Sequence, residues 1–131
     1  FLESIFQPLS ITFLVQKEVA NRICSRDKKE SILSLSVKVF GTPIYVEKVS
    51  RSLFRPAPNV DSAIIHIKDI HRGFKSAQEK ERFFEIIKKA FNSKRKKIST
   101  TLKNTTLPED LKNKRPEELS VSDFIRILNT N

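Results

Sequence analysis

The side chains whose types and spacing most clearly suggest chemistry form a basic run in the second half of the chain. Six cations fall within ten residues with no acid among them: Lys88, Lys89, Lys94, Arg95, Lys96 and Lys97. Acidic residues three or four positions away usually relieve such repulsion on a helix. The absence of acids within the run favours a phosphate-bearing partner, and the alternative is an ordinary solvated charged face.

A second feature is an aromatic residue in a proline-locked stretch, Leu53-Phe-Arg-Pro-Ala-Pro-Asn-Val-Asp-Ser. Pro56 and Pro58 fix their own φ at about −65° and push the residues before them, including Arg55, toward extended geometry. We therefore expect Phe54 on a stiff backbone that gives its ring a fixed direction. The alternative is that Phe54 fills a hydrophobic core.

Other reactive side chains have simpler explanations. Asp61 and Ser62 have no histidine base at a suitable offset, and a turn before a strand accounts for both as hydrogen-bonding residues. His66 and His71 have no companion ligands at metal-binding spacing, so we expect no metal site. Cys24 is the only cysteine, which rules out an internal disulfide and suits a reducing cytoplasm.

The composition favours a polyanionic partner. The 131 residues carry a formal net charge of +10, and residues 71–131, with 15 basic and 8 acidic side chains, are more basic than residues 1–70, with 10 and 7. Such a balance fits nucleic acid better than a membrane. The apolar start of the chain is interrupted by Glu3, Gln7 and Pro8, so we expect neither a signal peptide nor a membrane span. Only two glycines occur, so no glycine-rich loop for a self-contained Rossmann cofactor site is expected.

The elements that must position these residues begin with a β-α unit. Residues 1–7 place apolar side chains at one-four spacing, which predicts the end of an amphipathic helix. Residues 11–15 are apolar and β-branched, which predicts a buried strand. Residues 16–26 then take up the helical period, with Val19, Ala20 and Ile23 on one side.

Three further strands are predicted before residue 70. Residues 32–40 alternate, with Leu33, Leu35, Val37 and Val39 on one face. A second candidate runs over residues 44–49, and the stretch Phe54 to Ile67 ends in the third. The face of the third strand formed by Asp61, Ala63, Ile65 and Ile67 is the more apolar, as expected for an internal strand. Short connections predict antiparallel pairing.

The second half of the chain is predicted to be a small helical domain after a linker over residues 69–76. Apolar residues recur at three and four spacing from Ala77 to Phe91, and Ile98 and Leu102 continue the stripe after a break at Asn92-Ser93. Ser120 and Asp123 have the spacing of a capping box. They predict a final helix whose buried face is Val121, Phe124, Ile125 and Leu128.

Four segments, in order and spanning nearly the whole chain, resemble the ribosomal RNA adenine dimethyltransferases of the KsgA and Erm group. The motif Phe-x-Pro-x-Pro-x-Val-Asp-Ser at residues 54–62 resembles the late motif of that family. Residues 15–22 resemble the strand-to-helix segment after its catalytic motif, residues 90–98 its basic helix, and residues 115–121 the start of its last helix. One departure is Ser31-Ile-Leu-Ser34, where KsgA-type proteins usually carry Tyr-Gly before Leu-Ser-Val.

The resemblance implies an α/β plus α architecture. Residues 1–70 would be the carboxyl-terminal half of a class I, Rossmann-like methyltransferase sheet, and residues 71–131 a helical RNA-binding domain. The full-length family protein uses S-adenosylmethionine, and we expect none to be bound by this chain alone. The implied partner is small-subunit ribosomal RNA in a pre-30S particle, and the implied protein is a cytoplasmic monomer without membrane contact.

The resemblance also implies roles for particular residues. Phe54 would pack against the flipped-out target base, whereas the family's Asn-Leu-Pro-Tyr type motif is absent from this sequence, so no catalytic residue is expected in it. RNA binding is expected from the six cations of the basic run together with Lys17, Arg22 and Arg55. Two other functions stay open: a non-catalytic RNA-binding or assembly module, and part of an Erm-type methyltransferase acting on large-subunit ribosomal RNA.

Overall fold

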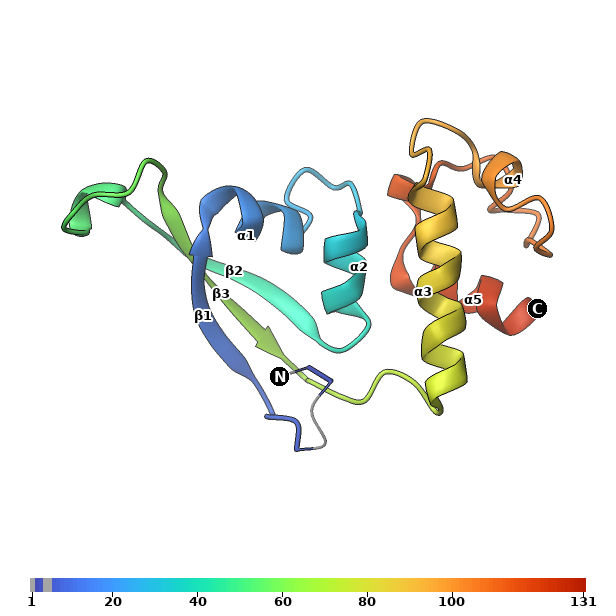
Figure 1. Cartoon of the computed structure of the whole chain (residues 1–131), viewed down its shortest axis with the longest axis horizontal. Helices are drawn as coiled ribbons and strands as arrows, with labels where there is room; N and C mark the ends of the chain where they lie inside the picture. Colours follow the sequence, from blue (N-terminus) through green and yellow to red (C-terminus); the bar gives the residue numbers. More distant parts are fainter. Residues whose placement is uncertain (1, 4–5) are drawn as a thin grey trace.

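The computed structural model describes residues 2–3 and 6–131 and contains one three-stranded antiparallel sheet (Figure 1). Strands β1 (Ile11–Gln16) and β2 (Thr42–Val49) both pair with β3 (Ser62–Lys68), so the order is β1-β3-β2. The register places Ile65 of β3 between Phe13 and Tyr45. The internal position predicted for β3 and the antiparallel pairing of β2 with β3 are confirmed.

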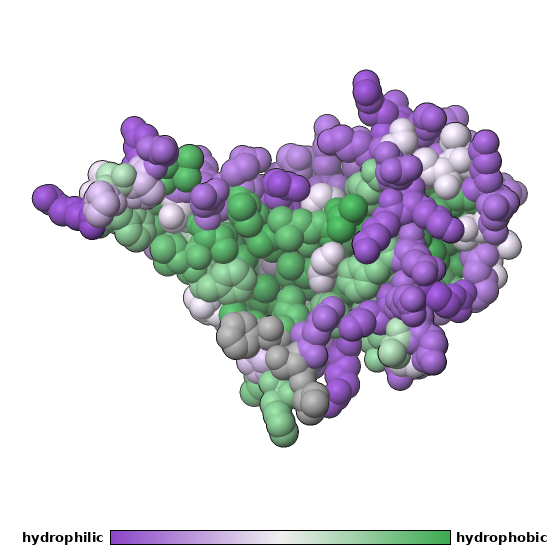
Figure 2. Space-filling view, viewed as in Figure 1, coloured by the Kyte–Doolittle hydropathy of each residue, from purple (hydrophilic) through white to green (hydrophobic). Residues whose placement is uncertain are grey.

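One face of the sheet is covered and the other is open. Ala63, Ile65 and Ile67 of β3 are at most 1% exposed and pack with helix α1 (Lys17–Ile23), as their alternation predicts. On the opposite face Leu14 and Ile44 remain 46% and 38% exposed. Figure 2 shows apolar surface gathered over the strand half of the molecule and polar surface over the helical half.

The strand predicted for residues 32–40 is wrong: this segment forms helix α2 (Ile32–Lys38). Ser31 caps the helix, because its hydroxyl accepts a hydrogen bond from the Ser34 backbone N–H at 3.1 Å while the Ser34 hydroxyl accepts one from the Ser31 backbone N–H at 2.8 Å. The sheet of the first half therefore has one strand fewer than predicted.

Apolar residues lie on two sides of α2, which explains the misleading alternation. Leu33 and Val37, four residues apart, pack into the core beneath the sheet, whereas Leu35 and Val39, also four apart, pack into the core of the helical half. Two stripes of apolar residues on a helix, offset by two positions, place an apolar residue at every second position. A strand with one buried face gives the same alternation. Helix α2 thus contributes side chains to both cores.

The helical half agrees largely with the sequence prediction, except that Ile127 is on the buried face of the last helix while Val121 and Ile125 are only partly buried. Helix α3 (Ala77–Phe91) begins at the cap residue Ser76 and ends at Asn92, and helix α5 (Val121–Thr130) begins with the predicted Ser120–Asp123 capping box. The short helix α4 (Ile98–Thr101) and two single 3₁₀ turns, η1 (Arg51–Leu53) and η2 (Pro116–Glu118), complete the structure. Buried side chains from α3, α4 and α5 form the core of this half: Phe83, Ile87, Ala90, Ile98, Phe124, Ile127 and Leu128.

The predicted linker over residues 69–76 is held by packing. The Phe74 ring lies 5.8 Å from that of Phe40 and 5.1 Å from that of Phe83, measured between ring centroids. Gly73 has φ of +77°, and an added Cβ would lie 3.0 Å from the Val39 carbonyl oxygen. Glycine is favoured there because L-residues are strained at such φ.

The amino-terminal residues allow only a partial test of the sequence prediction. The helix end predicted for residues 1–7 depends on the spacing of Phe1 and Ile5, which lie outside the described residues, and Leu2 and Glu3 form a turn. In the part of the chain that the structure describes, no helix has the length and apolar character needed to cross a membrane.

Candidate nucleic-acid interface

The connection between β2 and β3 forms an arm that extends away from the rest of the molecule (Figure 1). Its two sides are joined near the base, where the Arg51 backbone N–H donates to the Asp61 carboxylate at 2.8 Å and the Arg51 guanidinium donates to the Asn59 carbonyl oxygen at 3.1 Å. The Asp61 carbonyl oxygen accepts from the Lys17 backbone N–H at 2.9 Å. These bonds fix the arm to the start of α1.

Asp61 is the residue that joins both sides of the arm to the helix. The backbone N–H of Arg51 lowers the pKa of the Asp61 carboxyl, and the positive charges of Lys48, Arg51 and Lys17 lower it further. The carboxylate is therefore ionised at neutral pH and remains a hydrogen-bond acceptor. This arrangement gives Asp61 the hydrogen-bonding role that the sequence predicts.

Phe54 lies on the arm and belongs to neither of the two hydrophobic cores. Its side chain is half-buried, while its neighbour Leu53 is 74% exposed and Val60, across the arm, is 48% exposed. Within the described residues, Phe54 therefore fills neither core. Arg55, which follows Phe54, is exposed.

The other two cations predicted to bind RNA in the first half lie on α1. Lys17 is exposed and lines a shallow hollow of about 420 Å³ between the start of α1 and the base of the arm, together with Asn21, Arg51 and Asp61. Arg22 is in the last turn of α1 and is also exposed. Lys17 is thus beside the arm that carries Phe54, and Arg22 is one turn further along the helix.

The basic run lies at the opposite end of the molecule from the arm (Figure 1). Lys88 and Lys89 are in the last turn of α3, and the chain then turns back at Asn92 and Ser93. All six cations of the run are exposed. Among the described residues, none of them forms an ion pair with a carboxylate, whereas Lys38, Lys80, Lys112 and Arg126 do.

The turn at Asn92 and Ser93 brings further residues, which the sequence analysis did not select, close to the end of α3. A second hollow, of about 440 Å³, is lined by Lys88, Lys89 and Lys96 and also by Lys103, Thr100 and Thr101. Lys94, Arg95 and Lys97 do not line it. Lys103 follows α4 and lies outside the basic run, so only the break at Asn92-Ser93 could have indicated that it lies near α3.

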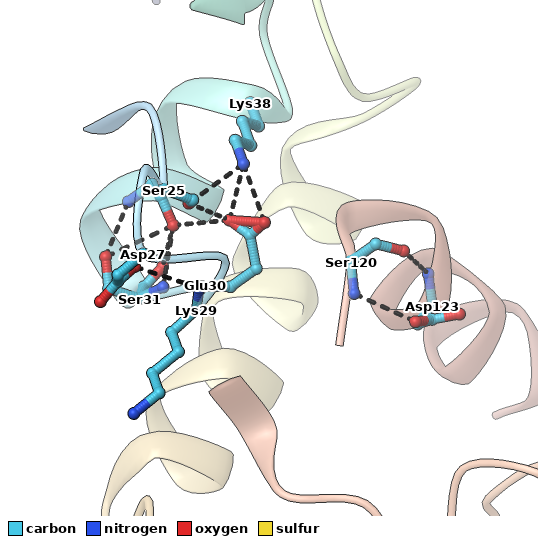
Figure 3. Close-up of polar contacts among 9 residues, drawn as sticks. Ser25, Asp27, Lys29, Glu30, Ser31, Lys38, Ser120 and Asp123 are labelled. Atoms are coloured by element: carbon cyan, nitrogen blue, oxygen red, sulfur yellow. Dashed lines mark hydrogen bonds and ion pairs between the residues drawn. The ribbon is translucent and has the colours of Figure 1, made fainter. Parts of the chain in front are cut away.

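A polar cluster lies where α1, α2 and the helical half meet (Figure 3). The Lys38 ammonium donates to both Glu30 carboxylate oxygens at 2.9 and 2.8 Å, and the hydroxyls of Ser25 and Ser34 donate to Oε1 at 2.6 and 2.8 Å. Burial by itself raises the pKa of Glu30, but the hydrogen bonds from Lys38, Ser25 and Ser34 outweigh it, so the pKa is lowered. The Glu30 backbone N–H also donates to the Glu117 carbonyl oxygen at 2.9 Å.

Cys24 and the possible metal ligands are the remaining reactive side chains among the described residues. Burial raises the pKa of the Cys24 thiol, although Lys38 and Arg26 lower it in part. A raised pKa leaves less of the reactive thiolate at neutral pH. In the described part of the chain, no group of three or more His, Cys, Asp or Glu residues is placed to hold a metal ion.

The fold is one already known from ribosomal RNA methyltransferases. The crystal structure of the 23S rRNA methyltransferase ErmE superposes with a TM-score of 0.69 and 20% identity, covering 92% of this chain and 54% of that chain. A dimethyladenosine transferase from Plasmodium falciparum superposes with a TM-score of 0.80 and 20% identity, covering 96% and 59%. At this identity the likeness establishes the fold alone.

The sequence itself establishes the family. The family model described as "Ribosomal RNA adenine dimethylase" matches residues 1–127, and the chain belongs to this family. A relative named "Ribosomal RNA small subunit methyltransferase A" from Fusobacterium nucleatum is 36% identical over 88% of this chain and 48% of its own length. One of the same name from Mesoplasma florum is 32% identical over 97% and 55%. The chain thus spans about half the length of these relatives.

Proposed function

We propose that this chain supplies the target-base and RNA-binding part of an S-adenosylmethionine-dependent enzyme that dimethylates N6 of adenine in small-subunit ribosomal RNA. The observation that carries the proposal is the position of Phe54, on an arm braced by Asp61 and outside both cores. The relatives are named as small-subunit methyltransferases, and these names support small-subunit ribosomal RNA as the proposed substrate.

An aromatic side chain in this position suits a base taken out of its helix. An enzyme that acts on a base ring must extrude the base, and a face against which the base can stack is worth about 1 to 3 kcal/mol. The arm holds Phe54 away from the body, where a ribosomal RNA strand can approach it. Lys17 at the base of the arm and Arg55 beside Phe54 would contact the adjacent phosphates.

The proposed architecture is the carboxyl-terminal half of a class I methyltransferase sheet in residues 1–70, followed by a helical RNA-binding domain in residues 71–131. Among the described strands β1 pairs only with β3, so its other edge has unpaired backbone N–H and C=O groups. The open sheet face also carries the exposed Leu14 and Ile44. An unpaired edge beside an exposed apolar face is a surface that further elements of a larger domain would cover.

The described residues do not fit S-adenosylmethionine. A cofactor of this kind needs a loop whose backbone can approach it closely, which glycine provides. An added Cβ at Gly41 would lie 2.8 Å from Ile67 Cγ2, and Gly73 packs against Val39 and Phe40, so both glycines serve internal packing. We propose that this chain alone neither holds the cofactor nor transfers methyl groups.

The proposed partner is small-subunit ribosomal RNA in a pre-30S particle, contacted by a monomeric cytoplasmic protein. The net charge of +10 and the exposed basic run support an RNA partner, because cations that neutralise phosphates release condensed counterions. A non-catalytic RNA-binding module has a specific observation in its favour, namely the poor fit to the cofactor. An Erm-type role on the large subunit is supported only by likeness of fold.

The test is methyl transfer by this chain alone and by the chain joined to the amino-terminal half of a longer relative, such as the Fusobacterium nucleatum protein. We expect transfer to adenine in small-subunit particles from the longer protein only. Activity in neither protein would favour the non-catalytic module, and activity confined to large-subunit RNA would favour the Erm-type role.

In the active protein Phe54→Leu should slow single-turnover methylation without lowering the melting temperature, while Phe54→Tyr, which keeps the ring, should restore the rate. Normal turnover in Phe54→Leu would contradict the stacking role.

A further inference from the structure

The hollow between the end of α3 and the segment around α4 differs chemically from the rest of the surface. Its charged side chains are Lys88, Lys89, Lys96 and Lys103, and no acid lines it. Thr100 and Thr101 line the hollow as well, and the Thr101 hydroxyl donates to the Ile98 carbonyl oxygen at 3.4 Å. Ammonium groups only donate hydrogen bonds and hydroxyls can donate, so the lining suits an oxyanion.

The framework beneath the hollow is rigid. Ile98 is fully buried and Leu102 is 2% exposed, and both pack into the same core as Ile87 and Ala90 of α3. The backbone N–H of Ile98 also donates to the Lys114 carbonyl oxygen at 2.9 Å. The two sides of the hollow are therefore held together by the core, which keeps the four lysines close in spite of their mutual repulsion.

We propose that this hollow is a phosphate-binding site for the RNA backbone, formed by the cations that line it and not by the basic run as a whole. The proposal rests on the RNA-binding role proposed above and deepens it. It assigns Lys103, Thr100 and Thr101 to the interface, and it separates Lys96 from its neighbours in sequence. Lys94, Arg95 and Lys97 contribute only to the general positive potential of this end of the molecule.

The physical reason for the distinction is cooperation between charges. A phosphate seated in the hollow is within reach of several ammonium groups and hydroxyls at once, whereas an isolated surface lysine offers a single, freely moving charge. Binding at the hollow also relieves the repulsion among the four lysines. Because these contacts read the backbone, the site is expected to accept structured RNA of any sequence.

The chain offers a matched pair of variants that remove the same charge. One is Lys88→Gln/Lys96→Gln/Lys103→Gln, inside the hollow, and the other is Lys94→Gln/Arg95→Gln/Lys97→Gln, outside it. Each lowers the net charge by three, and all six side chains are exposed, so both variants should fold. Thermal melts of both variants establish that they do.

Affinity for a short RNA duplex of mixed sequence is then measured across a salt series for the parent and both variants. We expect the hollow variant to lose about tenfold or more in affinity and roughly 0.7 to 0.9 in log-log salt slope for each phosphate contact removed, with the outer variant losing much less. Equal losses in the two variants, or a loss confined to the outer variant, would overturn the assignment while leaving RNA binding intact. Parent protein that does not bind RNA would overturn the RNA-binding function itself.

A second measurement locates the phosphate directly. Titration of the parent chain with inorganic phosphate, followed by NMR, should shift the backbone amide signals of Thr100 and Thr101 before those of Lys94 and Arg95. The hollow variant should lose these shifts and the outer variant should keep them. Shifts spread evenly over the basic run would mean that the hollow is not a site.

Discussion

Replacing Glu30 with Gln should destabilise the chain more than any surface charge change. Glu30 is 17% exposed and Lys38 is 26% exposed, and four hydrogen bonds from three side chains converge on the carboxylate. Gln keeps the shape but retains a single acceptor oxygen, and its NH₂ group faces a cluster of donors. Loss of hydrogen bonds to a charged group in a partly buried site costs about 2 to 3 kcal/mol.

The assay is thermal unfolding followed by circular dichroism. For a chain of this size each kcal/mol corresponds to roughly 4 °C, so the melting temperature should fall by about 8 to 12 °C. Glu109→Gln is the matched control, because Glu109 pairs with Lys112 at 2.7 Å but is 86% exposed. Exposed pairs contribute about 0 to 1 kcal/mol. Equal melting temperatures for the two variants would refute the role assigned to Glu30.

The pH dependence gives an independent test of the same cluster. The pKa of Glu30 is lowered in the folded chain from its ordinary value of 4.5, so its stabilisation is fully present above that value and is lost as the pH falls through the lower, folded value. The gap between parent and Glu30→Gln should therefore be constant near neutral pH and narrow below about pH 4.5. A gap that stays the same into the acid range would show that charge plays no part.

Two further predictions concern the backbone. Asp61→Ala should increase hydrogen exchange in the arm, at Arg51 above all, while exchange in α3 stays at the parent rate; an unchanged arm would show that Asp61 does not brace it. Gly73→Ala should lower stability by about 1 to 2 kcal/mol in chemical unfolding, because φ of +77° strains an L-residue and the new Cβ meets the Val39 carbonyl oxygen; a stable variant would contradict this.

Much of the fold could be predicted from local signals, and the main exception is helix α2. Helix α3 and strand β3 are each buried on a single side, so the stripe from Phe83 to Phe91 and the apolar face of β3 were predicted correctly. The Ser120–Asp123 cap is a local signal, and it is also confirmed. Helix α2 was missed because it is buried on two sides, so its apolar residues follow no single helical stripe. The cap formed by Ser31 and Ser34 was the available signal, but serine at the third position is a weaker one than glutamate.

The candidate site was predictable only where its residues are adjacent in sequence. Phe54 and the prolines that follow it stand out as a motif, and the six cations stand out as a run. Lys103 is separated from Lys88 by a turn and a short helix. The path of the chain through this turn depends on the packing of Ile98 and Leu102 in the core. Such a grouping is a property of the folded chain, which sequence patterns do not report.

Helix α2, which packs into both cores, fixes how far apart the two proposed RNA contacts lie. Because Leu33 and Val37 belong to one core and Leu35 and Val39 to the other, neither half can shift without opening the packing of its neighbour. The arm and the segment around α4 lie toward the two ends of the longest dimension of this single frame (Figure 1), and that segment lines the hollow together with the end of α3. A single RNA that makes both proposed contacts would have to bridge a fixed span, so the spacing of the two contacts would limit which RNAs can make both.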